Sequence, residues 1–251
     1  MTGGILKLIA VISMFIDHLA VALRLGGFLE TGKLYQAMRI IGRAAFPIYG
    51  LLLAVGVMHT RSRRKYFLRL FVFALISELP FDLALRGRLL VWDHQNVYFT
   101  LLLGFFIMCV IRWGSRLPGY KRYLGWGAAI ALSAGFALLS QKVLWFDYRA
   151  SGVIMLTVIG FLVAPLEEIR NWVPWENLVR CFFVAAAVLA MTPFTSGTEY
   201  YALFSLIPIA FYNGKRGYTN EAIKYAFYAF YPAHLMLLWL LFVLPAVGFR
   251  L

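Results

Sequence analysis

The sequence has little charge for its length. Only 14% of its 251 residues are charged, whereas about a quarter of the residues in a typical soluble domain are. Hydrophobic residues make up 62%, and the mean hydropathy is +0.77. These residues come in long blocks, and a helix of about 20 apolar residues crosses the hydrocarbon core of a bilayer. The composition excludes a soluble domain and predicts a polytopic protein surrounded by lipid.

The sequence is also poor in the residues that build disulfides, metal sites and phosphate loops. Its two cysteines, Cys109 and Cys181, lie inside apolar blocks, where a packing role is the ordinary one. No Cys/His spacing suits a metal ion, no Gly-rich phosphate loop is present, and no linker divides the chain. We therefore expect one domain over residues 1–251, with no metal and no disulfide.

The first apolar block begins close to Met1 and lacks a small-residue cleavage site after it. It carries Lys7, Asp17 and His18, which the apolar core of a signal peptide would not tolerate. We expect this block to be kept as the first membrane span.

The apolar blocks predict an all-α fold, a polytopic transmembrane helical bundle of about nine helices. Helices are expected because a chain in lipid must satisfy its own backbone hydrogen bonds. The predicted spans are Ile5–Leu25, Arg39–Met58, Tyr66–Leu83, Val97–Trp113, Tyr123–Leu139, Gly152–Ile169, Leu178–Met191, Tyr200–Phe211 and Lys224–Val247. The seventh and eighth are short and flanked by Pro193 and Pro208.

The net charge of +13 does not indicate a nucleic-acid partner, because the basic residues lie in short loops between the blocks. Cytoplasmic loops are enriched in Lys and Arg. Three basic loops fall on the N-terminal side in a nine-helix count, so we place that side in the cytoplasm. They hold Arg61, Arg63, Arg64 and Lys65, then Arg112, Arg116, Lys121 and Arg122, and finally Lys215 and Arg216. The other side carries Arg24, Lys33, Arg86, Arg88, Lys142 and Arg149.

Several ionisable residues lie inside the predicted spans, where each costs about 2.5–3.5 kcal/mol on insertion scales. At 1.5 Å per residue, His18 lies about 20 Å, Glu78 about 18 Å and His234 about 15 Å from the cytoplasmic side. Five helices thus bring polar side chains to one layer, which predicts a site. Its members are Asp17, His18, Arg43, Glu78, Asn96 and His234.

Structural roles compete with this interpretation. A membrane histidine such as His234 often only joins helices by a hydrogen bond, and an Arg43–Glu78 pair could only fix helix packing. Asp17 and His18 combine a carboxylate with an imidazole, the usual composition of a general base. Adjacent residues of a helix cannot face each other, so we expect Asp17 to have another partner.

Several segments resemble the TraX family of membrane acyltransferases. They occur in order along nearly the whole chain: MFIDH at 14–18, IGRAAFP at 41–47, HTR at 59–61, SELPFD at 77–82, the stretch 96–100, YNGKRG at 212–217 and YAFYPAHL at 228–235. The resemblance implies acetylation of a pilin N terminus during conjugation, at the bacterial cytoplasmic membrane. More broadly, it implies transfer of an acyl group from cytoplasmic acetyl-CoA or another acyl-CoA to a peptide, pilin or glycan-type acceptor.

The residues fit this chemistry. We expect His18 to act as the general base and Arg43 or Asn96 to stabilise the oxyanion. Glu78 or Asp82 would hold Arg43, and His234 is a second candidate for the base or for acceptor binding. An acyl-histidine relay through His18 is also open. The expected substrate-binding residues are Lys7, Arg39, Asp82 and Tyr231. The expected donor-binding residues are His59, Arg61, Arg63, Arg64, Lys65, Lys215 and Arg216.

The alternative is a proton-coupled transporter or flippase that uses the same carboxylates and histidines near the midplane. Such proteins often contain inverted repeats with interrupted helices at matching positions. No such repeat is evident, because the polar motifs cluster in the first four predicted spans and recur only in the ninth. This asymmetry favours the enzyme.

Overall fold

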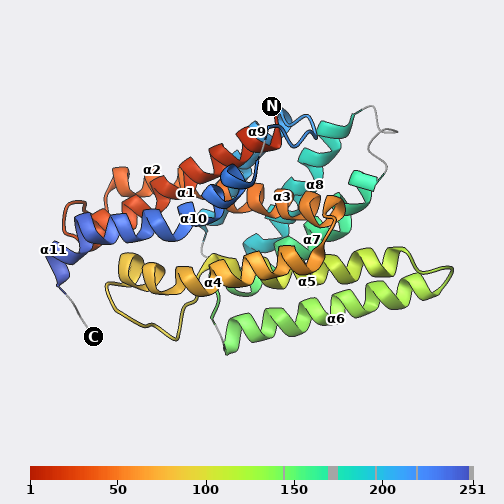
Figure 1. Ribbon diagram of the computed structural model, residues 1–251, viewed down its shortest axis with the longest axis horizontal. Coiled ribbons are helices and arrows are strands. Elements are labelled where there is room, and N and C mark those ends of the chain that lie inside the picture. The colour runs from red at the N-terminus through yellow and green to blue at the C-terminus, as the bar shows by residue number, and fades with distance from the viewer. Residues whose placement is uncertain (144, 169–174, 196, 219, 249–251) are drawn as a thin grey trace.

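A computed structural model describes residues 1–143, 145–168, 175–195, 197–218 and 220–248. These residues form an all-helical protein, as predicted, with an isolated β-bridge between Gln95 and Phe146 (Figure 1). The elements are α1 (Gly3–Leu25), α2 (Lys33–Gly42), α3 (Ala45–His59), α4 (Arg63–Arg86), α5 (Val97–Ser115), α6 (Lys121–Lys142), α7 (Arg149–Glu168), α8 (Glu176–Met191), η2 (Thr192–Phe194), η3 (Thr198–Ser205), α9 (Leu206–Ala210), α10 (Glu221–Leu238), η4 (Trp239–Val243) and α11 (Leu244–Val247).

Six helical stretches of the described residues are long and apolar enough to cross a membrane. They are Gly3–Leu25, Lys33–His59, Val97–Ser115, Lys121–Lys142, Glu176–Phe194 and Glu221–Val247. The surface agrees with this assignment, because α4 and α6 carry large apolar side chains that are exposed in the isolated chain. Examples are Leu75 and Ile76 on α4, and Leu124 and Ile130 on α6. An apolar surface of this kind is stable in lipid rather than in water, so the chain is a multi-pass membrane protein.

Helices cover all nine predicted segments within the described residues, but two segments differ in form. The second is not one helix, because α2 ends at Gly42 and α3 begins at Ala45. The eighth consists of the 3₁₀ helix η3 and the five-residue helix α9, so two short helices of different type occupy this predicted span instead of one α-helix. Pro208 lies within α9 and cannot donate a backbone hydrogen bond. The predicted end of the sixth span, Ile169, lies outside the described residues.

The bundle has two distinct ends. At the end that holds the N terminus, the Met1 ammonium donates to the carbonyl of Phe211 over 2.7 Å, and the amide of Gly3 donates to Lys215 over 2.8 Å. Arg112, near the end of α5, donates to the carbonyl of Met58 in α3 over 2.6 Å. We call this the N-terminal end. The opposite end holds the α1–α2 turn, the α4–α5 loop and α11, at the left of Figure 1.

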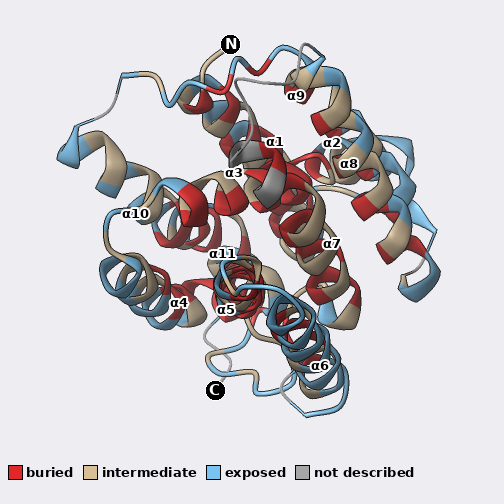
Figure 2. Cartoon of the chain, turned by 90° about the vertical axis from the view of Figure 1, so that its right-hand side faces the viewer, coloured by how far each residue is buried: buried red, intermediate tan, exposed pale blue. Residues whose placement is uncertain are grey.

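Figure 2 shows buried residues concentrated on α3, α5 and α7, while α4 and α6 turn exposed residues outward. Glycines allow the helices to approach closely. A Cβ on Gly125 of α6 would lie 2.4 Å from the Cα of Gly114 on α5, and a Cβ on Gly104 would lie 2.5 Å from Leu156 on α7. Small residues at such crossings let membrane helices pack backbone against backbone.

We predict that Gly125→Val destabilises the protein, because the new side chain meets the backbone of Gly114, which cannot move aside without shifting α5 or α6. Overpacking of this kind costs about 1–3 kcal/mol. The matched control is Gly127→Val in the same helix, where a Cβ meets nothing within 4 Å. The measurement is the apparent melting temperature in detergent. Equal melting temperatures for the two variants would contradict the close α5–α6 packing.

Candidate functional site

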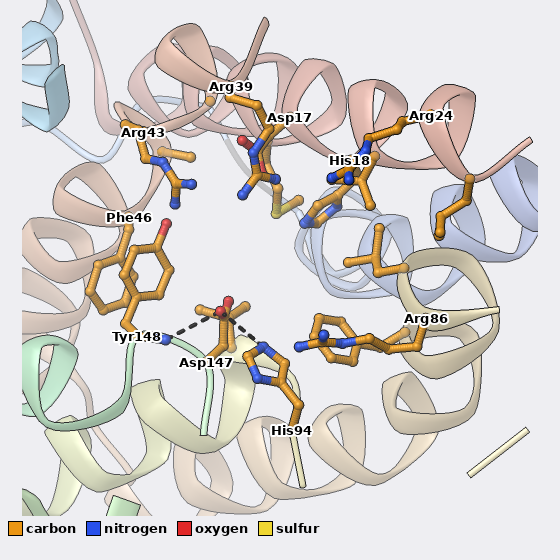
Figure 3. Close-up of a pocket in the computed structure, with 18 of the residues that line it drawn as sticks. Asp17, His18, Arg24, Arg39, Arg43, Phe46, Arg86, His94, Asp147 and Tyr148 are labelled. Carbon is orange, nitrogen blue, oxygen red and sulfur yellow. Dashed lines mark hydrogen bonds and ion pairs between the residues drawn. The ribbon is translucent and has the colours of Figure 1, made fainter. Parts of the chain in front are cut away.

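A cavity of about 740 Å³ lies toward the end opposite the N terminus (Figure 3). Helices α1 to α4 form most of its wall, and the segments before α5 and α7 complete it. Its charged and polar lining residues include Asp17, His18, Arg24, Arg39, Arg43, Arg86, His94, Asp147 and Tyr148. The structure therefore brings together part of the predicted polar layer and adds residues from loops.

The centre of the site is a hydrogen bond between His18 of α1 and His234 of α10. Nδ1 of His18 lies 2.7 Å from Nε2 of His234, and the two rings are nearly coplanar at 8°. Nδ1 of His234 lies 2.7 Å from the carbonyl oxygen of Phe230. A carbonyl only accepts, so Nδ1 of His234 carries the proton and its Nε2 accepts from His18 when both rings are neutral. Nε2 of His18 then keeps a lone pair and can accept a proton.

Tyr231 packs edge-on against both imidazoles, with ring centroids 5.8 Å from His18 and 5.7 Å from His234. Its side chain is buried, and Tyr231 is not among the residues that line the cavity. Tyr231, which was predicted to bind substrate, thus packs against the histidine pair on the side away from the cavity. It does so because Tyr231 and His234 are three residues apart on α10 and share a face.

Asp17 has the separate partner that its position on α1 predicts. Its Oδ2 lies 2.7 Å from Nη1 of Arg39 on α2. Gly42 makes this approach possible, since a Cβ there would lie 2.3 Å from the Cβ of Asp17. The predicted substrate-binding residue Arg39 lines the cavity, next to the histidine pair.

The structure corrects the expected Arg43–Glu78 pair. Arg43 lies in the break between α2 and α3, and its Nη1 is 3.0 Å from Oε1 of Glu199 in η3. Nε of Arg43 is buried and has no hydrogen-bond partner among the described residues. Glu199 was not predicted, because it lies just outside an apolar block and its contact with Arg43 depends on the return of the chain after α8.

Glu78 and Asn96 form a structural contact between α4 and α5. The side-chain amide of Asn96 donates to Oε2 of Glu78 over 2.5 Å and to the carbonyl of Ala74 over 2.8 Å. Its oxygen accepts from the amide of Tyr98 over 3.0 Å and caps the start of α5. Both amide hydrogens are therefore used, and Asn96 has no donor left for an oxyanion. Glu78 does not hold Arg43.

Asp82 also has a local role. Its Oδ2 accepts from the backbone amide of Val91 over 2.8 Å, and the residue is fully buried. It fixes the loop that follows α4 and neither contacts Arg43 nor lines the cavity. The two roles predicted for Asp82, holding Arg43 and binding substrate, therefore lack a geometric basis.

Two loop segments contribute residues that sequence reasoning did not place in the site. Nε2 of His94 lies 3.6 Å from Oδ1 of Asp147 (Figure 3), and Tyr148 stacks on Phe46 with ring centroids 4.0 Å apart. Burial raises the pKa of Tyr148, although Arg43 opposes the shift. Its hydroxyl therefore stays protonated and neutral. Tyr148 has a positive φ of 61°, which is uncommon for a residue other than glycine. This feature could have drawn attention to Tyr148, but it is visible only in the backbone of the structure and not in the sequence.

The predicted donor-binding residues lie elsewhere. His59, Arg61, Arg63, Arg64, Lys65, Lys215 and Arg216 are found at the end of α3, the start of α4 and the segment that docks on α1. All belong to the N-terminal end, and none of these described residues lines the cavity. Lys7 is near this end too, with Nζ 5.0 Å from the ring centroid of Phe227.

The site therefore combines a neutral imidazole that can accept a proton with guanidinium groups that can stabilise an oxyanion. Among the described residues, no group of His, Cys, Asp and Glu side chains is arranged to hold a metal ion. The protein therefore belongs to the class of multi-pass helical membrane proteins, with a polar cavity at whose wall His18 is hydrogen-bonded to His234.

Comparison with known proteins gives the family. The model of the family described as "TraX protein" matches residues 2–242, so this chain belongs to the TraX family. It is also 30% identical over 247 residues to the "Probable fimbrial assembly protein FimC, serogroup H1" of Dichelobacter nodosus, with 93% of this chain and 92% of the relative covered. No solved structure gives a significant match.

We predict that Glu199→Gln lowers the stability of the protein. The substitution removes the ion-pair partner of the largely buried Arg43 guanidinium, and breaking a buried pair costs about 3–5 kcal/mol. The control is Glu221→Gln, which removes an exposed partner of Lys224 and should change stability by less than about 1 kcal/mol. Apparent melting temperatures in detergent decide the prediction, and a Glu199→Gln variant as stable as Glu221→Gln would contradict it.

Proposed function

We propose that this protein is a membrane-embedded acyltransferase that moves an acyl group, in the first place acetyl, from acyl-CoA to an amine or hydroxyl of an acceptor. The single observation that carries the proposal is the hydrogen-bonded chain from the carbonyl of Phe230 through His234 to His18 at the cavity wall. It makes Nε2 of His18 a proton acceptor inside an apolar bundle, where such a group costs free energy and needs a reason.

The proposed reaction uses His18 as base and then as acid. Nε2 of His18 takes the proton of the acceptor amine or hydroxyl as its nitrogen or oxygen attacks the thioester carbonyl carbon. The carbonyl π electrons move to oxygen, and collapse of the intermediate restores the carbonyl and breaks the C–S bond. The CoA thiolate then takes the proton from His18. The acylated acceptor, free CoA thiol and neutral His18 remain, so protons and electrons balance.

Arg43 is the proposed oxyanion donor. Its Nη1 is used by Glu199, whereas its buried Nε is without a partner among the described residues. Preorganised donors act strongly where water is excluded, and one donor is worth roughly 3–4 kcal/mol in the transition state. Of the two donors considered from the sequence, Arg43 is the one with a free hydrogen, since the Asn96 amide is fully engaged.

His234 is a positioning residue. It does not line the cavity, and it orients His18 by accepting the Nδ1 proton. When His18 takes a second proton, this hydrogen bond becomes charge-assisted and so stronger. The pair therefore resembles other oriented bases in which a second group selects the tautomer of the imidazole.

The two ends of the bundle suit two substrates. We propose that the N-terminal end is cytoplasmic, that the chain crosses the bilayer along the nine helical segments, and that the basic residues there bind the phosphates of acyl-CoA. From Gly3 to His18 the donor's acyl arm must reach about 22 Å along α1 at 1.5 Å per residue. The cavity lies toward the opposite end, which suits an acceptor that arrives from outside the cytoplasm.

A pilin-type peptide is the acceptor class that the relatives favour. Pilin acetylation is the activity that the TraX resemblance implies, and the Dichelobacter relative is named for fimbrial assembly. The cavity volume of about 740 Å³ lies within the range of roughly 300–1,000 Å³ that is typical of ligand pockets. It can therefore hold the first few residues of a peptide. The free amine of a peptide N terminus is a nucleophile that His18 could deprotonate.

We predict that His18→Gln reduces acyl transfer by about 10²–10⁴-fold, the usual contribution of a general base. The assay is thiol release from acetyl-CoA by protein in nanodiscs, with a membrane-fraction lysate that supplies the acceptor. The control is Ser133→Ala on α6, a residue that does not line the cavity. Release by wild type that His18→Gln does not reduce would exclude His18 as the base.

We further predict that His234→Gln keeps more activity than His234→Leu. A glutamine oxygen can still accept the Nδ1 proton of His18, whereas leucine cannot. If His234 were only structural, His234→Leu would be at least as active as His234→Gln, because leucine suits an apolar helix better.

The absence of thiol release with every acceptor pool, together with no binding of CoA, would overturn the acyltransferase proposal. The transporter would then be the better explanation.

A further inference from the structure

Two arginines at the mouth of the cavity have no role in the proposed chemistry. Arg24 is in the last turn of α1 and Arg86 in the last turn of α4, and both line the cavity. Figure 3 shows their side chains on the same side of it, beyond His18 and His94. Both residues are exposed, so their guanidinium groups are open to a ligand. We call them the mouth arginines.

The other arginines that line the cavity lie in ion pairs, and these two do not. Asp17 neutralises Arg39, Glu199 neutralises Arg43, and Asp147 faces His94. Within the described residues, neither mouth arginine has a carboxylate within ion-pair distance. Arg24 is only stacked on Tyr35, with its guanidinium carbon 5.5 Å from the ring centroid. Asp82 of α4 interacts electrostatically with Arg86, but no ion pair among the described residues holds either guanidinium group, so both remain available to a ligand.

A simpler role explains only part of this arrangement. An arginine in the last turn of a helix interacts favourably with the helix dipole, by roughly 0.3–1 kcal/mol. That effect does not require two helices to direct their terminal arginines to one cavity. Positive residues are also disfavoured on the non-cytoplasmic side, which is where the proposed topology places them. A ligand would account for both features.

We propose that Arg24 and Arg86 bind a carboxylate of the acceptor peptide while its amine lies at His18. The proposal rests on the proposed function and adds the chemical class of its acceptor, an acidic peptide. The guanidinium fork pairs with a carboxylate through two parallel hydrogen bonds. Stacking on Tyr35 limits the conformations of Arg24, which reduces the entropy lost on binding.

The spacing along α1 sets where the acidic residue lies in the peptide. Six residues separate His18 from Arg24, which corresponds to about 9 Å along the helix. An extended peptide advances about 3.3–3.6 Å per residue. The carboxylate therefore belongs to a residue about three positions from the acylated amine, at position three or four of the acceptor.

The test is peptide binding without acyl-CoA, so that it does not depend on catalysis. The protein is placed in nanodiscs of phosphatidylcholine, and the probes are two fluorescent peptides, Ala-Ala-Asp-Ala and Ala-Ala-Asn-Ala, amidated at the C terminus. Their dissociation constants are measured for wild type, Arg24→Gln and Arg86→Gln. The matched control is Arg88→Gln, an exposed arginine two residues from Arg86 that does not line the cavity.

We expect wild type to bind the aspartate peptide about tenfold more tightly than the asparagine peptide, the order of magnitude of a charge-assisted hydrogen bond. Arg24→Gln and Arg86→Gln should each reduce this preference, and Arg88→Gln should keep it. Arg86→Lys should keep only part of it, because lysine retains the charge without the fork. Apparent melting temperatures equal to wild type show that the variants are folded.

Several results would overturn the proposal. Equal binding of both peptides by wild type excludes a carboxylate site. If the preference for the aspartate peptide survives both Arg24→Gln and Arg86→Gln, the carboxylate binds elsewhere. If phosphatidylglycerol nanodiscs stabilise wild type but neither glutamine variant, and no peptide preference exists, the mouth arginines bind lipid headgroups instead. If wild type releases no thiol from acetyl-CoA but still prefers the aspartate peptide, the acyltransferase proposal is refuted and the carboxylate site is supported.

Discussion

The hydrogen bond between His18 and His234 joins two helices whose histidines are 216 positions apart in the chain. In the interior of a bilayer the apolar surfaces of helices gain little from meeting each other, because lipid is equally apolar. A hydrogen bond between polar side chains on two helices therefore contributes to the choice of neighbouring helices. The contact of α1 with α10 contains this hydrogen bond, and the remaining polar contacts of the bundle likewise join different elements.

Each ionisable residue of the polar layer has a partner on a different element. Asp17 of α1 binds Arg39 of α2, Arg43 binds Glu199 of η3, and Glu78 of α4 binds Asn96 at the start of α5. These pairs divide into two groups. The Glu78–Asn96 contact is complete in itself and fixes two helices, whereas the arginine pairs leave guanidinium nitrogens that face the cavity. The same physical requirement thus produces both packing contacts and a site.

The two ends of the molecule differ in chemistry. The N-terminal end gathers basic side chains around the segment that docks on α1, and the other end opens into a cavity with a positive mouth. The histidine pair lies between them. The proposed transfer from an anionic donor on one side to an acceptor on the other requires this polarity, together with an apolar bundle that excludes water.

The class of fold follows from the sequence alone, because long apolar blocks leave a backbone in lipid no alternative to helices. The family also follows from the sequence, and so do several residues of the site. His18, Asp17, Arg43 and His234 came from the cost of placing ionisable groups in lipid, whereas Arg39 was expected as a substrate-binding residue. The separate partner of Asp17 followed from helix geometry alone. These inferences are local, since they depend on composition, spacing and the period of a helix.

The pairing of these side chains depends on how the helices pack. Glu199 and Asp147 reach the site through returns of the chain that no periodicity encodes, and the engagement of Asn96 as a helix cap appears only when α4 lies beside α5. The form of the eighth segment and the break at Arg43 also depended on packing. The physical reason is that a side chain's depth can be counted along its own helix, whereas its partner is set by how the helices rotate about their axes and pack.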